Sequence, residues 1–177
     1  DVILHNDVFS GGNQNNDVAV FRPVFRDGRL IAWAACKGHQ ADIGGAQSGG
    51  YNPEAREVWQ EALRITPIKV YERGELRRDV WRMIFANIRF RIVEEDIKAQ
   101  IGATRVGERG LQGLFRRFEQ ERFDACIDYL FATSERIVRR EIAAITDGVY
   151  RGTSWAFYDG VNEGSRMKIE LAVTVAG

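Results

Sequence analysis

The sequence has little histidine, cysteine or proline, and it has no surplus of either charge. Among 177 residues there are two histidines, two cysteines and three prolines. Cys36 and Cys126 lie far apart in different contexts and indicate no disulfide framework, so we expect a reducing compartment. Basic and acidic residues balance at 25 each, and this zero net charge argues against a binder of nucleic acid or acidic membranes.

Long apolar runs are absent as well. No run approaches the roughly 18 residues that a transmembrane helix needs, and no signal-peptide pattern is present. The hydrophobic content of 45% is ordinary for a globular protein, and 177 residues suffice for one domain with a sizeable core. The sequence starts in strand-like residues at Asp1 and stops inside an alternating strand at Gly177, so we expect a segment of a larger subunit.

A β-hairpin is predicted near the start of the chain. Two apolar runs, residues 18–25 and 30–36, flank a four-residue connection that contains Asp27-Gly28. Asp-Gly between such runs is the strongest short signal for a hairpin turn. Both runs are almost continuously hydrophobic, which predicts that the hairpin is buried on both faces.

The middle of the chain shows helical periodicity and the end alternates again. Apolar residues recur at helical spacing in the segments 55–63, 76–84, 97–118 and 123–145. Residues 149–158 and 167–175 have strand character. We therefore predict an α+β fold within a single segment, 1–177: a β-rich N-terminal hairpin region (1–52), a central helical layer (53–146) and a C-terminal β-hairpin (147–177).

The hairpin register brings a candidate metal site together. If Asp27 and Gly28 form the turn, counting outward places Asp17 opposite Gly38 and within one residue of His39. Asp42 follows three residues later on the loop. One imidazole and two carboxylates form a ligand set for manganese, iron or zinc, with too little sulfur for structural zinc. Gly38, Gly44 and Gly45 are expected to let the backbone approach a ligand closely.

A purely structural interpretation stays open for each of these residues. Asp42 precedes Ile-Gly-Gly and suits a turn, His39 suits a satisfied strand end, and Asp17 suits the entry to a strand. A β-bulge in the hairpin would change the face to which Asp17 points. His5 and Asp7 are further candidates from a neighbouring strand, and the polar loop at residues 11–16 suits either a plain turn or a ligand-facing loop.

The same stretches resemble the hydantoinase B/oxoprolinase family over essentially the whole segment. The resemblance lies in HNDVFSGGNQNNDVAVFRPVF, GHQADIGG, EALRITPIKVY, ANIRFRIVEEDIKAQIGA and DGVYRG. The usual loop of the family has a histidine where this chain has Gln14. The NQNND version looks most like the metal-bearing large (alpha) subunit of acetone carboxylases, with acetophenone carboxylases as close relatives.

The resemblance implies a cytoplasmic, multi-subunit, ATP-dependent and biotin-independent ketone carboxylase. It implies a divalent metal, manganese first and zinc or iron as alternatives, on Asp17, His39 and Asp42. His39 and Asp42 are also the implied catalytic residues, while His5, Asp7 and Gln14 stay open as further ligands. The implied partners are a hydantoinase A-like subunit that binds ATP and a small third subunit. The metal would stabilise the enolate of the activated ketone while it forms a carbon–carbon bond with CO2 derived from bicarbonate.

Two other functions compete with the ketone carboxylase. The first is a subunit of an ATP-dependent hydantoinase or 5-oxoprolinase, which attacks an amide ring instead of a ketone. The second is a structural segment that serves subunit assembly and has no site of its own.

Overall fold

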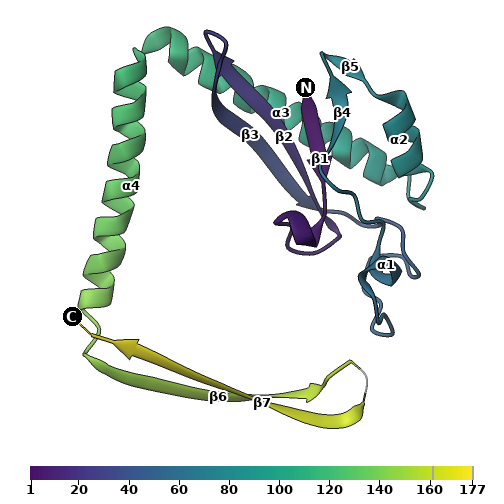
Figure 1. The fold of residues 1–177 in the computed structure, drawn as a ribbon, viewed down its shortest axis with the longest axis vertical. Helices are drawn as coiled ribbons and strands as arrows, with labels where there is room; N and C mark the ends of the chain where they lie inside the picture. Colours follow the sequence, from purple (N-terminus) through teal and green to yellow (C-terminus); the bar gives the residue numbers. More distant parts are fainter. Residues whose placement is uncertain (161, 177) are drawn as a thin grey trace. The chain divides into compact units, whose positions relative to one another are not determined.

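The structure is a computed structural model that describes residues 1–160 and 162–176 of the chain. It divides into two compact units, Asp1–Arg117 and Phe118–Gly177, each of which is shown in Figure 1. Val161 and Gly177, which belong to the predicted C-terminal hairpin, lie outside the described residues. The mixed helices and antiparallel strands confirm the predicted α+β fold.

The first unit is built on a five-stranded sheet with the order β3-β2-β1-β4-β5. Its strands are β1 (Val2–His5), β2 (Asp17–Arg26), β3 (Arg29–His39), β4 (Ile68–Glu72) and β5 (Glu75–Leu76), and all neighbours pair antiparallel. Asp27 and Gly28 have φ angles of 50° and 77° at the predicted turn, as a two-residue type I′ connection requires. The predicted hairpin is therefore confirmed.

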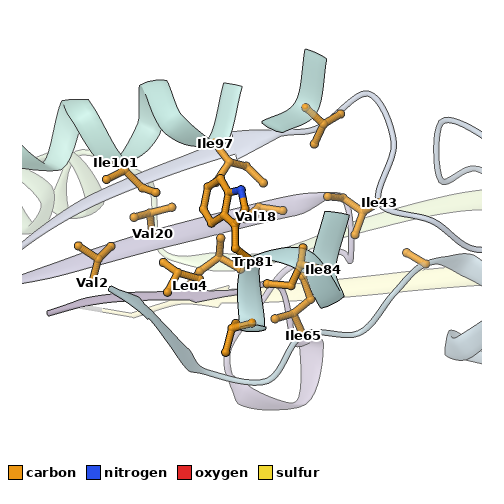
Figure 2. Packing of buried hydrophobic residues seen from close by; sticks show 14 residues of the cluster. Val2, Leu4, Val18, Val20, Ile43, Ile65, Trp81, Ile84, Ile97 and Ile101 are labelled. Carbon is orange, nitrogen blue, oxygen red and sulfur yellow. The ribbon is translucent and has the colours of Figure 1, made fainter. Parts of the chain in front are cut away.

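The helices of this unit cover one face of the sheet. They are α2 (Arg78–Phe85) and the long α3 (Ile92–Arg117), with the 3-10 turn Val8–Ser10 and the short α1 (Val58–Glu61) in the connections. Side chains from alternate strand positions meet the helices in one apolar cluster, labelled in Figure 2. Fully or almost fully buried members include Leu4, Val18, Val20, Ile84 and Ile97. Since strand side chains alternate between faces, the odd-numbered residues of β2 point to the opposite face.

Two local expectations about this unit are wrong. β3 is an edge strand whose Leu30 and Trp33 are 47% and 48% exposed, so the hairpin is not buried on both faces. The helix expected over residues 55–63 shortens to the four residues of α1. Ala62 is already extended, and Leu63 N–H donates to Ile43 O at 2.7 Å, so backbone pairing with a distant loop replaces the last helical turn.

The second unit consists of α4 (Gln120–Ala143) and the antiparallel hairpin of β6 (Gly148–Tyr158) and β7 (Glu163–Val175). No residue of this unit that the structure describes is buried. The apolar stripe that predicted α4 is exposed and includes Ile127, Leu130, Phe131, Val138 and Ile142. None of the helices in the described part of the chain combines the length and the apolar character needed to cross a membrane.

Candidate functional site

A β-bulge sets the register that brings Asp17 to His39. Phe25 pairs with Leu30 next to the turn, but Val24 pairs with Ala32, so β3 contains one extra residue at Ile31. The pairing beyond this point is shifted by one, and Asp17 lies directly opposite His39 instead of Gly38. The predicted convergence of these two residues is thus present, through a different register from the one counted outward from the turn.

Asp17 and His39 form the centre of a polar cluster on the sheet face opposite α3. Asp17 Oδ1 lies 2.9 Å from His39 Nδ1, and Gln14 Nε2 lies 3.1 Å from both atoms. Lys37 Nζ contacts the other carboxylate oxygen of Asp17 at 3.0 Å. The Asp17 side chain is 13% exposed and that of His39 is 44% exposed, so the carboxylate is shielded while the imidazole is open to solvent.

The surroundings of Asp17 keep its carboxyl group ionised. Partial burial acts to raise the pKa of Asp17, but hydrogen bonds from Lys37, His39 and Gln14 together outweigh burial and lower the pKa from 3.8 to about 2. In the Nδ1–H tautomer, His39 donates to the ionised carboxylate of Asp17, and Gln14 donates to the same carboxylate. This arrangement leaves Nε2 of His39 as the ring nitrogen with a free lone pair.

A pocket of about 520 Å³ lies beside the imidazole. Four of its nine lining residues have amide side chains, and the aromatic ring of Tyr51 stacks on His39 with ring centroids 6.1 Å apart. The lining residues are Gln14, Asn15, Asn16, His39, Gly50, Tyr51, Asn52, Pro53 and Glu61. An oriented imidazole next to a pocket is suited to accept a proton from a bound water or substrate.

Asp42 does not join this cluster. Its fully buried carboxylate accepts from Arg89 twice, at 2.9 Å from the guanidinium Nη1 and at 2.7 Å from the backbone N–H. Across residues 1–160 and 162–176, no three His, Cys, Asp or Glu side chains are grouped so that they could hold a metal ion. The predicted three-ligand set is therefore not assembled: the structure brings Asp17 and His39 together and holds Asp42 apart on Arg89.

The other two candidates from the first strand have partners of their own. His5 is 9% exposed and stacks on Phe21, with ring centroids 5.4 Å apart. Asp7 is buried and accepts from Arg64 Nε at 2.6 Å and from the Ser10 hydroxyl. The Arg64 hydrogen bond, followed by that of Ser10, lowers the pKa of Asp7 well below its usual range. Neither residue is in hydrogen-bond contact with Asp17 or His39 within the described part of the chain.

The glycines after Asp42 approach protein backbone, and this explains their conformation. Gly44 and Gly45 have φ angles of 74° and 85°, which side chains rarely adopt. A Cβ on Gly45 would collide with the carbonyl of Glu61, and one on Gly44 would lie 2.7 Å from the Asn87 carbonyl. The loop from β3 is therefore held close to α1, which forms the pocket wall at Glu61.

Several pocket residues could not be assigned from the sequence. Tyr51 is 70% exposed and stacks on His39, and no motif in the sequence marks it as part of a site. Glu61 lies in the segment with the predicted helical periodicity, but no motif marks it as part of a site. The sequence did indicate one part of the pocket wall, the loop at residues 11–16. Its cluster of glutamine and asparagine side chains suits a ligand-facing loop.

Comparison with known proteins decides the family. A family model described as hydantoinase B/oxoprolinase matches residues 1–177. The chain belongs to the hydantoinase B/oxoprolinase family. This confirms the family resemblance that the sequence motifs indicated.

Two relatives are similar in sequence. The beta subunit of caprolactamase from Pseudomonas jessenii is 42% identical over 155 residues, which are 87% of this chain and 27% of that relative. The B-type subunit of a putative D-/L-hydantoinase from Pseudomonas sp. (strain NS671) is 31% identical over 180 residues, or 99% of this chain and 30% of the relative. The chain thus spans less than a third of the length of either relative.

Solved structures agree with the fold. The crystal structure of the ATP-dependent caprolactamase from Pseudomonas jessenii matches all of this chain and 31% of its own, with a TM-score of 0.90 and 39% identity. An acetone carboxylase structure matches 98% of this chain and 24% of its own, with a TM-score of 0.78. Its 20% identity makes it evidence for the fold alone.

Loss of the Arg89 side chain should destabilise the first unit strongly. Arg89→Leu leaves the Asp42 carboxylate buried without a cation, which costs about 3–5 kcal/mol in the free energy of unfolding. Urea unfolding of the 177-residue chain measures this. As a control, Arg139→Leu breaks the exposed Arg139–Glu135 pair and should cost less than about 1 kcal/mol. Equal losses in the two variants would contradict the structural role of Asp42–Arg89.

Ionised Asp17 should stabilise the protein at neutral pH and lose this effect in acid. Its folded pKa of about 2 lies below the ordinary 3.8, so its contribution is complete above about pH 5 and disappears as the pH falls towards about 2. The difference in unfolding free energy between the wild type and Asp17→Asn should therefore shrink across that range. Urea unfolding at several pH values measures it, and a difference that grows in acid would contradict the assignment.

Proposed function

We propose that this chain is the segment of an ATP-dependent cyclic amide hydrolase that contributes the acid–base pair Asp17–His39. The observation that carries the proposal is the 2.9 Å contact that orients His39 beside an amide-lined pocket. The similarity to subunits of a caprolactamase and of a putative hydantoinase supports ring opening of an amide as the reaction.

The geometry suits hydrolysis of an activated carbonyl group. In the proposed reaction, Nε2 of His39 takes a proton from the attacking water. Asp17 holds the ring through Nδ1–H and stabilises the imidazolium that forms. The Lys37 ion pair and the Gln14 hydrogen bond keep Asp17 ionised for this purpose. The carbon–nitrogen bond of the ring then breaks, and the nitrogen leaves as an amine after taking the proton from His39. The phosphoryl group that ATP placed on the carbonyl oxygen is released as inorganic phosphate by a second water.

The described segment contributes only part of such an enzyme. We propose that ATP is bound by a hydantoinase A-like partner subunit, with a small third subunit in carboxylase-type complexes, and that the assembly works in the cytoplasm. Both similar proteins are themselves described as single subunits of larger enzymes, which supports a hetero-oligomer.

A ketone carboxylase is the second candidate. The NQNND loop favours it, because Gln14 stands where the usual loop of the family has a histidine. In this structure Gln14 contacts both members of the acid–base pair, so a change at this position acts directly on the site. Higher sequence identity to two amide-ring enzymes supports hydrolysis as the first candidate.

The complete complex should open cyclic amides only when ATP is present. We expect a ring-opened product when caprolactam or a hydantoin is the substrate. We expect no acid-stable labelled product when a ketone is incubated with labelled bicarbonate. His39→Gln should lower kcat at least about 100-fold, since it removes a general base, while the melting temperature is kept. His5→Gln is the matched control and should stay active.

Fixation of label without ring opening would favour the carboxylase. Full activity of folded His39→Gln would favour an assembly segment.

We further propose that a divalent metal, manganese before zinc or iron, binds at the Asp17–His39 pair. The pair offers one oxygen and one nitrogen donor, fewer than the three protein ligands usual for a catalytic site, so the described residues alone do not fit a complete site. We therefore assign no reaction step to the metal.

Metal analysis of the purified complete complex tests this second proposal. His39→Ala and Asp17→Ala should retain less metal than the wild type, because the first loses the nitrogen donor and the second loses an oxygen donor together with the hydrogen bond that holds the imidazole. His5→Gln should retain the full amount. If Asp42 leaves Arg89 and binds the metal in the complex, Asp42→Ala should also retain less metal than the wild type. Unchanged metal in both His39→Ala and Asp17→Ala would reject the site.

A further inference from the structure

The imidazole of His39 is anchored at one of its ring atoms. Among the described residues, both of its hydrogen-bond contacts are at Nδ1, with Asp17 Oδ1 at 2.9 Å and Gln14 Nε2 at 3.1 Å. The side chain is 44% exposed, so the surrounding protein encloses little of the ring. A ring held at one atom can turn about that contact, whereas a general base needs its accepting atom fixed to within about 0.5 Å. A second contact is therefore required to fix the plane of the ring.

Tyr51 provides this second contact on the face of the imidazole. The two ring centroids are 6.1 Å apart and the ring planes are inclined by 27°. Stacked rings at such a separation attract each other beyond the apolar area that they bury. Tyr51 is itself 70% exposed and contributes little to the core, so its contact with His39 is the main effect of its position.

Asn16 ties the segment that carries Tyr51 to the end of β3. The residue is 4% exposed, and its Nδ2 donates to Gly49 O at 2.8 Å. Its backbone carbonyl accepts from Gln40 N–H at 2.8 Å. Gln40 directly follows His39, and Gly49 lies two residues before Tyr51. One buried residue thus connects the two segments whose rings stack.

The loop around Tyr51 is shaped for this close approach. Gly50 has a φ angle of 70°, and a Cβ at this position would collide with the side chain of Asn16. On the other side of Tyr51, Asn52 Oδ1 accepts from Gln47 Nε2 at 3.3 Å, which closes the loop on itself. A side chain at residue 50 would push the loop away from Asn16 and carry Tyr51 with it.

We infer that Tyr51 is a positioning residue for His39: its ring fixes the plane of the imidazole, and Asn16 and Gly50 hold the loop that carries it. The inference rests on the proposed function, in which Nε2 of His39 takes a proton from the attacking water. Tyr51 contacts neither the water nor the proton in this reaction and acts only through the imidazole.

Kinetics of the complete complex with ATP and caprolactam test the inference. Tyr51→Leu should lower kcat about three- to tenfold, the effect of losing an aromatic pair, while KM stays within about twofold. Tyr51→Phe keeps the ring and should keep kcat within about twofold of the wild type. Phe9→Leu removes an aromatic ring that is 69% exposed and lies outside the pocket wall, so this matched control should leave kcat unchanged.

A glycine pair tests the loop that carries Tyr51. Gly50→Ala should lower kcat to a similar extent as Tyr51→Leu, because the added Cβ displaces the loop. Gly74→Ala is the control: its φ angle of 89° gives similar backbone strain, but its Cβ would meet nothing within 4 Å. A higher KM at unchanged kcat in Tyr51→Leu would assign Tyr51 to substrate binding and overturn the positioning role. Equal losses of kcat in Tyr51→Leu and Tyr51→Phe would overturn it too.

Chemical modification reads the stacking contact without turnover. Diethylpyrocarbonate acylates accessible imidazoles, and the chain has two histidines, so mass spectrometry of the complex reads His39 with His5 as internal reference. With a chelator present, Tyr51→Leu should raise the rate at His39 several-fold and leave that at His5 unchanged, because one face of the His39 ring is uncovered. An unchanged rate at His39 overturns the inference. Faster modification of His39 without ring opening by the wild type supports the contact and overturns the proposed reaction.

Discussion

The antiparallel pairing of β2 with β3 is the constraint on which both the core and the candidate site depend. Alternate residues of β2 serve opposite faces, so Val18 and Val20 enter the core while Asp17 points away from the helices. The bulge at Ile31 then decides which residue of β3 stands across from Asp17. Without that extra residue Asp17 would face Gly38, and the carboxylate would have no imidazole directly opposite. The contact between Asp17 and His39 is therefore a consequence of strand register.

Buried polar groups hold the pocket loops against this sheet. Asn6 is fully buried and uses both ends of its amide: Oδ1 accepts from Ile65 N–H at 2.6 Å, and Nδ2 donates to the carbonyls of Asn15 and Leu63. One side chain thereby ties the asparagine-rich loop to the segment after α1. Satisfied buried amides of this kind are costly to break, because each freed group would stay buried without a partner. Hydrogen bonds of this buried amide thus help to position the pocket wall, together with the apolar packing of Ile43, Ala62 and Ile65.

The parts that the sequence could predict are those with local signals. The Asp27-Gly28 turn, the strand pair around it and the long helices follow from short-range patterns, and the proximity of Asp17 to His39 follows from counting along the hairpin. The partner of Asp42 could not be predicted in this way, because Arg89 is 47 residues away in the sequence and reaches Asp42 only through the tertiary fold. The shortened α1 has the same cause, since the pairing of Leu63 with Ile43 overrides the helical periodicity of its own segment.

Asp42 shows why a sequence motif with histidine and aspartate has two physical interpretations. A carboxylate that is fully removed from water needs a positive charge beside it, and a guanidinium meets this need as a divalent metal would. Burial of Asp42 is consequently no evidence for a metal by itself. The distinction lies in geometry: Arg89 holds both carboxylate oxygens from its side chain and its backbone, and His39 contacts Asp17. A metal on both His39 and Asp42 would therefore require Arg89 to release a buried anion. Its binding free energy would have to exceed the cost of breaking that ion pair.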